Sequence, residues 1–124
     1  MRGSTTFEDN VSTIAGGGIF NSAGQVTVVG TPGSTPADTI RVAFISNLTG
    51  GAGGGIYNSA GGSVAISTAT FRGNQAGDIL GGGAIFSAAG GTALSVGDTI
   101  FNSPPLNSPG NITGDFVDTG SNLF

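Results

Sequence analysis

Residues 53–61 read GGGIYNSAG, and similar nonapeptides occur before and after them. The earlier copy is GGGIFNSAG at residues 16–24, and the later copy is the more altered GGAIFSAAG at residues 82–90. Such self-similarity indicates a repeat architecture, in which each copy forms one structural unit and the units stack. We therefore expect a single domain of stacked repeats across the 124 residues.

The composition is that of a folding chain, although 25 residues are glycine. Hydrophobic residues make up 37% of the chain and charged residues 8%, whereas disordered chains combine low hydrophobicity with high charge. Glycine does not recur at every third position, which excludes a collagen triple helix.

The charge pattern limits the partners. The net charge is −4, and Arg2, Arg41 and Arg72 are scattered, so the chain lacks the basic cluster that binds nucleic acid. The absence of cysteine excludes disulfides and thiolate metal sites. No apolar run approaches the roughly 18 residues of a membrane-spanning helix, so no transmembrane segment is expected.

Other residues recur in register with the nonapeptide. A Phe lies twelve residues before the Ile of the first two copies and fourteen before that of the third, and an Asn follows each of these Phe residues at the third position. After each Ile comes a short segment of alternating aliphatic residues, which is typical of a strand. These aliphatic pairs are Val26 and Val28, Val64 and Ile66, and Leu94 and Val96.

Each repeat therefore predicts three short strands, and no segment shows a helical period. The predicted fold class is all-β, a parallel β-helix (β-solenoid) of about three to four coils stacked at about 4.8 Å. We expect residues 1–4 to be a vector-derived leader, with a short native leader as the alternative. Residues 5–103 would form the coils, with a Pro/Gly/Ser-rich loop inserted at 31–38. Residues 104–124 would form a C-terminal tail or partial cap.

Stacked coils place like residues on like. We expect one internal aromatic column, one internal aliphatic column and ladders of asparagine side chains that hydrogen-bond from coil to coil. The glycines before each Ile would allow a tight corner with close approach of the backbone. The expected members are Phe7, Phe44, Phe71 and Phe101; Ile19, Ile56 and Ile85; Asn10, Asn47 and Asn74; and Asn21 and Asn58.

The pattern Phe-x-x-Asn followed by Gly-Gly-Ala/Gly-Ile-x-Asn resembles the repeat of chlamydial polymorphic membrane proteins. It is also similar to the GGGIYNS repeats of bacterial secreted right-handed parallel β-helix proteins. The resemblance covers about residues 5–101, although Ser87 replaces the asparagine in the third copy and removes one ladder position. It implies a right-handed helix, an extracellular or cell-surface setting and often adhesion.

Residues that could carry chemistry do not cluster. Glu8 lies beside Asp9, and Asp115 lies three residues before Asp118, but the acids occupy unlike positions in their repeats. A polysaccharide-cleaving β-helix needs acids gathered on one face, so we expect no enzyme and no catalytic residue. Asp78 with Asn74 would make a weak calcium site, and corner hydrogen bonding is the preferred reading. No cofactor or metal is expected.

The residue after each Ile is aromatic, namely Phe20, Tyr57 and Phe86. If the Ile residues point inward, alternation turns these aromatic side chains outward as a stripe. Contiguous exposed apolar surface usually marks an interaction site, here a lateral contact or a carbohydrate-stacking strip. The alternative is that the inserted loop or the C-terminal tail covers it.

The ends of a solenoid expose unpaired strand edges, which tend to associate. The first repeat begins at Thr5-Thr6-Phe7 without a polar cap, so the chain either derives from a longer solenoid or stacks end to end. We predict a non-enzymatic extracellular structural or adhesive protein that self-associates into a fibre or forms part of a longer surface protein. A host surface or glycan is a possible partner. The alternative is a carbohydrate-binding or carbohydrate-degrading module.

Overall fold

The computed structural model describes residues 4–35, 38–79, 81–90, 93–101 and 106–124, and these residues form short strands and turns without a helix. The leader expected at residues 1–4 and the Pro104–Pro105 segment therefore lie largely outside the described residues. Every strand pairs in parallel with its neighbours, in four sheets. The all-β, parallel fold predicted from the repeats is confirmed.

The strands recur in the same order along the chain, and each recurrence is one coil. The first coil contains β1 (Thr6–Glu8), β2 (Val11–Ser12), β3 (Ile19–Asn21) and β4 (Gln25–Val29). The second contains β5 (Val42–Ile45), β6 (Leu48–Thr49), β7 (Ile56–Asn58) and β8 (Ser63–Ser67). The third contains β9 (Ala69–Arg72), β10 (Gln75–Ala76), β11 (Ile85–Ser87) and β12 (Leu94–Gly97). A fourth coil contributes β13 (Ile112–Thr113) and β14 (Val117–Asp118).

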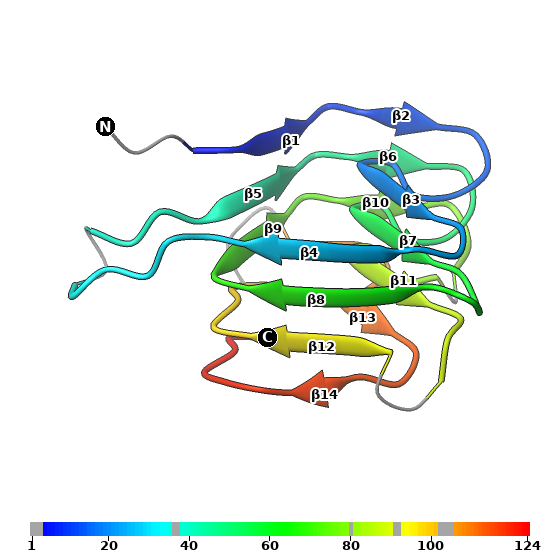
Figure 1. Cartoon of the computed structure of the whole chain (residues 1–124). Coiled ribbons are helices and arrows are strands. Elements are labelled where there is room, and N and C mark those ends of the chain that lie inside the picture. The colour runs from blue at the N-terminus through cyan, green and yellow to red at the C-terminus, as the bar shows by residue number, and fades with distance from the viewer. Residues whose placement is uncertain (1–3, 36–37, 80, 91–92, 102–105) are drawn as a thin grey trace.

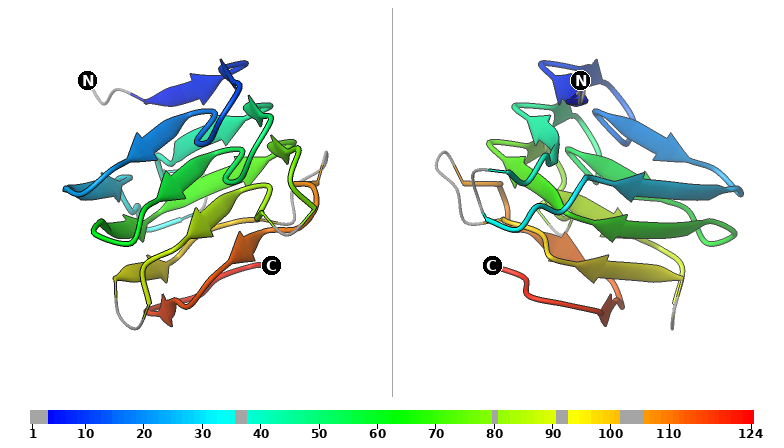
Figure 2. Two further views of the ribbon diagram at one scale, coloured as in Figure 1. Left: turned by 90° about the vertical axis from the view of Figure 1, so that its right-hand side faces the viewer. Right: turned by 60° about the vertical axis from the view of Figure 1, so that its left-hand side comes forward.

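Corresponding strands of successive coils form the sheets. The orders are β1-β5-β9, β2-β6-β10, β3-β7-β11-β13 and β4-β8-β12-β14. In Figure 1 the chain runs to the right along β1 and β2, returns to the left along β4 nearer the viewer, and descends one layer with each coil. This path is right-handed, as is usual for parallel strands joined by crossovers. Figure 2 shows the same stack from two other sides, with the first coil at one end and the fourth at the other.

Each of the first three coils has four strands rather than the expected three. The additional strand has two residues and follows the ladder asparagine, as in β2 and β6. The residue before that asparagine has a positive φ, 54° at both Asp9 and Ser46. This left-handed residue turns the chain so that the next two residues pair with the neighbouring coil. A pair of residues is too short to show alternation, so the sequence pattern does not reveal it.

The glycine corner has two separate requirements. Gly53 has a φ of 72°, in the left-handed region that glycine adopts without steric cost. Gly54 meets a different limit, because a Cβ atom there would lie 2.3 Å from the carbonyl oxygen of Gly83 and 2.6 Å from the backbone nitrogen of Gln75. The corner therefore passes directly against the backbone of neighbouring strands, where no side chain fits.

Like residues stack inside the helix. The register pairs Ile19 with Ile56 and Ile56 with Ile85, and the phenylalanine rings lie parallel at 4.6–5.2 Å between centroids. The middle members of these columns are completely buried, because coils cover them on both sides. The aromatic column contains Phe7, Phe44, Phe71, Phe101 and, beyond the expected members, Phe124.

Two segments depart from the repeat. The insertion after β4 projects from the stack (Figure 1), and its base is closed by backbone hydrogen bonds in both directions between Thr31 and Ile40, at 2.7 and 2.8 Å. The segment expected as a tail or partial cap carries β13 and β14, which extend two of the sheets. It ends with Leu123 pairing in parallel with Ile100.

Candidate interaction surfaces

The aromatic stripe forms on the outer face of the sheet that contains β3, β7 and β11. Its ring centroids are 5.2 Å apart from Phe20 to Tyr57 and again from Tyr57 to Phe86, with interplanar angles of 4° and 13°. Phe20 is 54% exposed, and the other two residues are half-buried. Neither the inserted loop nor the C-terminal segment covers the Phe20 end of the stripe.

The orientation of these rings limits what they can bind. Because the rings stack along the helix axis, each covers a face of its neighbour and turns its edge toward solvent. A sugar ring that packs on an aromatic side chain needs the face of the ring. The stacking covers both faces of Tyr57 and one face of each outer ring, so the stripe offers mainly a ridge of ring edges rather than a platform for a glycan.

The asparagine ladder runs through the corner between the first and second sheets. The side-chain amide nitrogen of Asn47 donates to Oδ1 of Asn74 at 2.9 Å, and Asn74 donates in the same way to Asn107 at 2.9 Å. Asn10 donates to Asn47 at 2.9 Å from the exposed end. Each Oδ1 in this ladder also accepts the backbone N–H of the preceding rung, for example that of Asn47 at Asn74. The ladder is a structural element whose polar atoms are already paired.

A second ladder lies inside the corner after β3 and β7. Asn21 donates to Oδ1 of Asn58 at 2.9 Å, and Asn58 donates to the hydroxyl oxygen of Ser87 at 3.2 Å. The hydroxyl of Ser87 then donates to the carbonyl oxygen of Ala89. Serine therefore ends this ladder by turning its proton toward the backbone of its own coil.

The carboxylates do not assemble into a site. Glu8 and Asp9 are exposed at the first coil, and Asp115 is exposed near the other end. Among the described residues, no group of three or more His, Cys, Asp or Glu side chains is arranged to hold a metal ion. Asp78 is exposed, while the amide of Asn74 is buried within the ladder, so the two do not present a joint pair of ligands.

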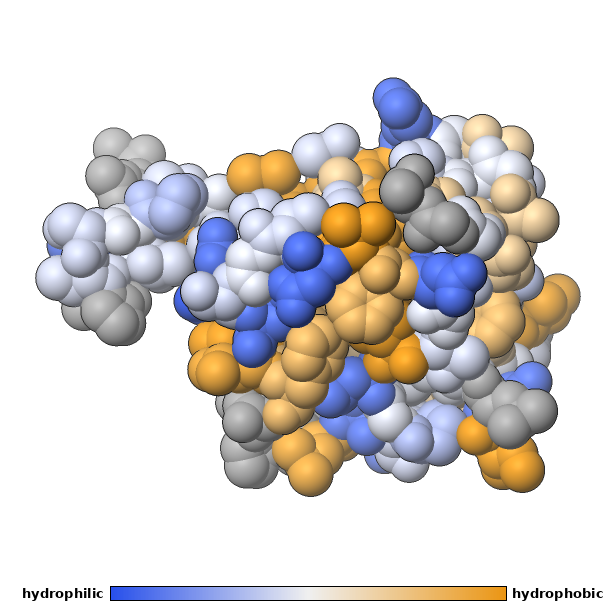
Figure 3. Space-filling model, turned by 90° about the horizontal axis from the view of Figure 1, so that it is seen from below, coloured by the Kyte–Doolittle hydropathy of each residue, from blue (hydrophilic) through white to orange (hydrophobic). Residues whose placement is uncertain are grey.

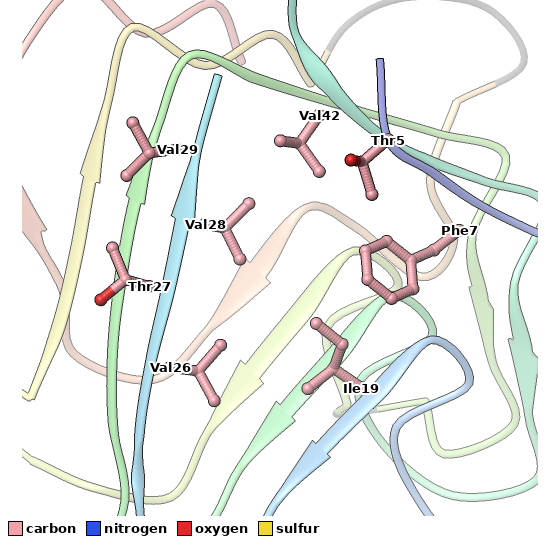
Figure 4. A pocket seen from close by; sticks show the side chains of 8 residues that line it. All are labelled: Thr5, Phe7, Ile19, Val26, Thr27, Val28, Val29 and Val42. Atoms are coloured by element: carbon pink, nitrogen blue, oxygen red, sulfur yellow. The ribbon is translucent and has the colours of Figure 1, made fainter. Parts of the chain in front are cut away.

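The N-terminal end is an open apolar bowl. β1, β2, β3 and β4 are each the terminal strand of their sheets, so one backbone edge of each is unpaired. Between them lies a cavity of about 270 Å³, into which the inward side chains of the first coil point (Figure 4). The described residues that line it include no charged side chain. The residues that give it its character are Phe7, Ile19, Val26, Val28, Val42 and Thr5.

The C-terminal end is filled differently. The ring of Phe124 stacks under Phe101 at 5.2 Å, and Phe116 lies against Phe124 at 5.8 Å with an interplanar angle of 53°. Asp118 occupies the column that contains Val28, Ile66 and Val96 in the other coils. Seen from this end, hydrophobic residues lie at the centre with hydrophilic residues directly beside them (Figure 3).

Sequence patterns missed three column members of the last coil. Asn107 continues the asparagine ladder, Ile112 continues the isoleucine column, and Phe124 continues the phenylalanine column. Asn107 follows Phe101 by six residues instead of three, and Ile112 lacks the glycine corner. The only available signal was the residue types themselves, in the order Phe, Asn and Ile.

Comparison with known proteins agrees with the repeat at the start of the chain. Residues 4–22 match the Chlamydia polymorphic membrane protein repeat, which here spans β1 to β3. Searches of the curated proteins and of the solved structures gave no significant match. No helix long and apolar enough to cross a membrane occurs in the described part of the chain. The chain is a parallel β-helix repeat protein whose first coil resembles the repeat of the Chlamydia polymorphic membrane proteins.

Proposed function

We propose that this chain is a non-enzymatic extracellular β-solenoid with a structural or adhesive role, and that it associates end to end with further copies. The single observation that carries the proposal is the open apolar bowl at the N-terminal end. The surface setting and the adhesive role are supported by the similarity of residues 4–22 to the Chlamydia polymorphic membrane protein repeat.

The bowl has the chemistry of a β-helix interface. Its rim offers unpaired backbone donors and acceptors along four parallel strand edges, and its floor is aliphatic and aromatic. A partner that satisfies both must bring strand edges of its own together with inward apolar side chains. Another coil of the same cross-section meets these requirements, and a second copy of this chain supplies one.

The symmetry of such contacts determines whether the copies form a closed oligomer or an open fibre. When the end of one copy meets the opposite end of the next, the interface is heterologous and the assembly grows as an open fibre. The described residues that line the bowl are uncharged, so no charge repulsion arises inside it, although Glu8 and Asp9 are exposed on the same coil.

The carbohydrate alternative loses its main support. It relied on Phe20, Tyr57 and Phe86 as a stacking strip, but these rings cover one another and expose edges. A glycan-binding role for the stripe is therefore not the function that the geometry favours. A lateral protein contact along the ridge stays compatible with an adhesive role.

Association is tested by analytical ultracentrifugation over a wide range of protein concentration. We expect mass to rise with concentration for the native chain, and Val26→Asp to abolish the rise because it places a charge in the bowl. Ala65→Asp is the matched control, since this exposed residue lies on the outer face of the same sheet, one coil away. An equal effect of both variants would refute the proposal. So would the absence of any rise both for the native chain and for a variant with Leu123→Gly and Phe124→Gly.

A further inference from the structure

Resting on this end-to-end association, we propose that the C-terminal segment 119–124 is an internal competitor that holds the site of the next copy's first strand. In this arrangement the C-terminal end accepts a second copy only after the segment has left its place. The relevant partner is the segment Thr6–Glu8 of that second copy.

At the C-terminal end the first sheet has one layer more than the third and fourth sheets. This additional layer lies where the first strand of a second copy would pair. The column of the first sheet has five members, Thr6, Ala43, Thr70, Ile100 and Leu123. The column of the third sheet has four members, Ile19, Ile56, Ile85 and Ile112. The fourth sheet also has four layers, which end at β14.

An incoming copy would have to continue all these columns together. Its β3 would lie under β13 and its β4 under β14, each one layer further down. Its own β1 precedes these strands in the same coil, so in register β1 falls on the layer that Leu123 and Phe124 already occupy. The two strands even present the same pattern, with an inward phenylalanine at Phe7 and at Phe124.

The segment is held by hydrogen bonds from several of its residues. The backbone nitrogen of Thr119 donates to the carbonyl oxygen of Val96 at 2.9 Å, and that of Ser121 donates to Oδ1 of Asp98 at 3.2 Å. The backbone nitrogen of Phe101 donates to the carbonyl oxygen of Leu123 at 2.7 Å, and the nitrogen of Leu123 donates to that of Thr99 at 2.9 Å. Leu123 and Phe124 are 54% and 50% exposed. An incoming coil would replace these contacts with backbone pairing in several sheets, which would offset the loss of the segment's own hydrogen bonds.

Hydrogen bonds of Asn122, one of them to Asp118, also hold the segment in place. Asn122 donates to Oδ1 of Asp118 at 2.8 Å and to the carbonyl oxygen of Val96 at 2.9 Å. Its own Oδ1 accepts the backbone N–H of Thr99 at 3.0 Å. Through Asn122 the segment therefore covers a carboxylate that stands where other coils have valine or isoleucine.

A disulfide lock tests the proposal in the chain of 124 residues. The native chain has no cysteine, and Ile100 and Leu123 are parallel register neighbours, close enough for a disulfide between cysteines placed there. In the double variant Ile100→Cys, Leu123→Cys, oxidation holds the segment in place and reduction frees it. We expect the concentration at half-association to be about tenfold higher or more when oxidised, because the competent fraction falls.

The control is Ala65→Cys with Ser95→Cys, register neighbours of β8 and β12 whose coils stay together in any assembly. Its oxidation should not change association. As a second variant, Leu123→Gly with Phe124→Gly weakens the segment and should lower the concentration at half-association below that of the native chain.

The outcomes separate the two proposals. If the native chain associates but neither the lock nor the glycine variant shifts the concentration, the competitor role is overturned and end-to-end association stands. If no form associates, including the glycine variant, end-to-end association itself is refuted.

Discussion

The two ends of this solenoid are built from the same columns and yet differ. At the N-terminal end the columns stop at Phe7, Ile19 and Val28, which leave an apolar bowl. At the C-terminal end the column of Val28 stops at Asp118, and the phenylalanine column is extended by Phe124. The asparagine ladder ends there by donation from Asn107 to Asn111 at 3.1 Å. The N-terminal end thus exposes a surface on which a further coil can pack, whereas the C-terminal end is partly covered.

The two ends differ in how their unpaired strand edges are protected from association. An unpaired strand edge with apolar side chains beside it is a site of association, and proteins protect such edges with charges, irregular segments or covering chain. The C-terminal end uses a carboxylate, a tilted aromatic ring and a covering segment. The N-terminal end has neither a tilted aromatic ring nor a covering segment among the described residues, and its exposed carboxylates Glu8 and Asp9 do not line the bowl, so we expect the two ends to respond differently to the same change.

The largest effect is expected in the isoleucine column. Ile56→Asp buries a charge between two coils and should cost about 4 kcal/mol or more of unfolding free energy. Ile19→Asp in the half-buried N-terminal layer should cost clearly less, because water reaches that layer. Denaturation by urea, followed by circular dichroism, measures both. Equal losses would mean that the N-terminal end is covered as well as the middle.

In the asparagine ladder, too, a substitution at a buried middle position should cost more unfolding free energy than one at the exposed N-terminal position. Both losses should be smaller than in the isoleucine column. Asn74→Ala leaves the amide and the backbone N–H of Asn47 without their acceptor and should cost about 3 kcal/mol. Asn10→Ala removes only donors at an exposed rung, so about 1 kcal/mol or less is expected. Thermal denaturation of the two variants provides the comparison. A larger loss for Asn10→Ala would contradict the gradient.

At the C-terminal end, removing the carboxylate should change association more than stability. Asp118→Val restores an apolar residue to its column, and the unfolding free energy should shift by no more than about 1 kcal/mol. The concentration at half-association should fall. Asp115→Val is the control, because it removes the same charge nearby without altering the column. If both variants associate alike, the net charge and not the column is responsible.

The smallest effect is expected at the aromatic stripe. Tyr57→Ala removes two ring contacts and should cost about 1 kcal/mol of stability. Retention on polysaccharide gels should be unchanged for Tyr57→Ala and for Phe86→Ala, because the ring faces are covered in the native chain. A clear loss of retention with the fold intact would restore the carbohydrate alternative.

The middle of the molecule could be predicted from sequence because its repeats are regular. The spacing from Phe7 to Ile19 equals that from Phe44 to Ile56, so the residues that stack on one another can be read from the sequence. The last coil could not be predicted in the same way. Its residues keep the types but lose the spacing, and pairing with the third coil is what aligns Asn107 and Ile112.

The orientation of the rings in the aromatic stripe is a second feature that the sequence does not predict. Alternation indicates that Phe20, Tyr57 and Phe86 point outward, and the register brings them together. Whether they offer faces or edges depends on the side-chain torsions that stacking at about the strand spacing imposes. That arrangement follows from the assembled coils and has no counterpart in the order of residues.

The sequence by itself determined that the chain forms stacked parallel coils, because the same residue types recur in the same order in each repeat and can pack on one another only when the coils are in register. It also determined which side chains form the inner columns of the first three coils. Only the tertiary structure decided how the stack ends. The pairing of Leu123 with Ile100 joins residues whose spacing follows no repeat, and it forms because the folded fourth coil brings the edge at Ile100 within hydrogen-bonding distance of Leu123.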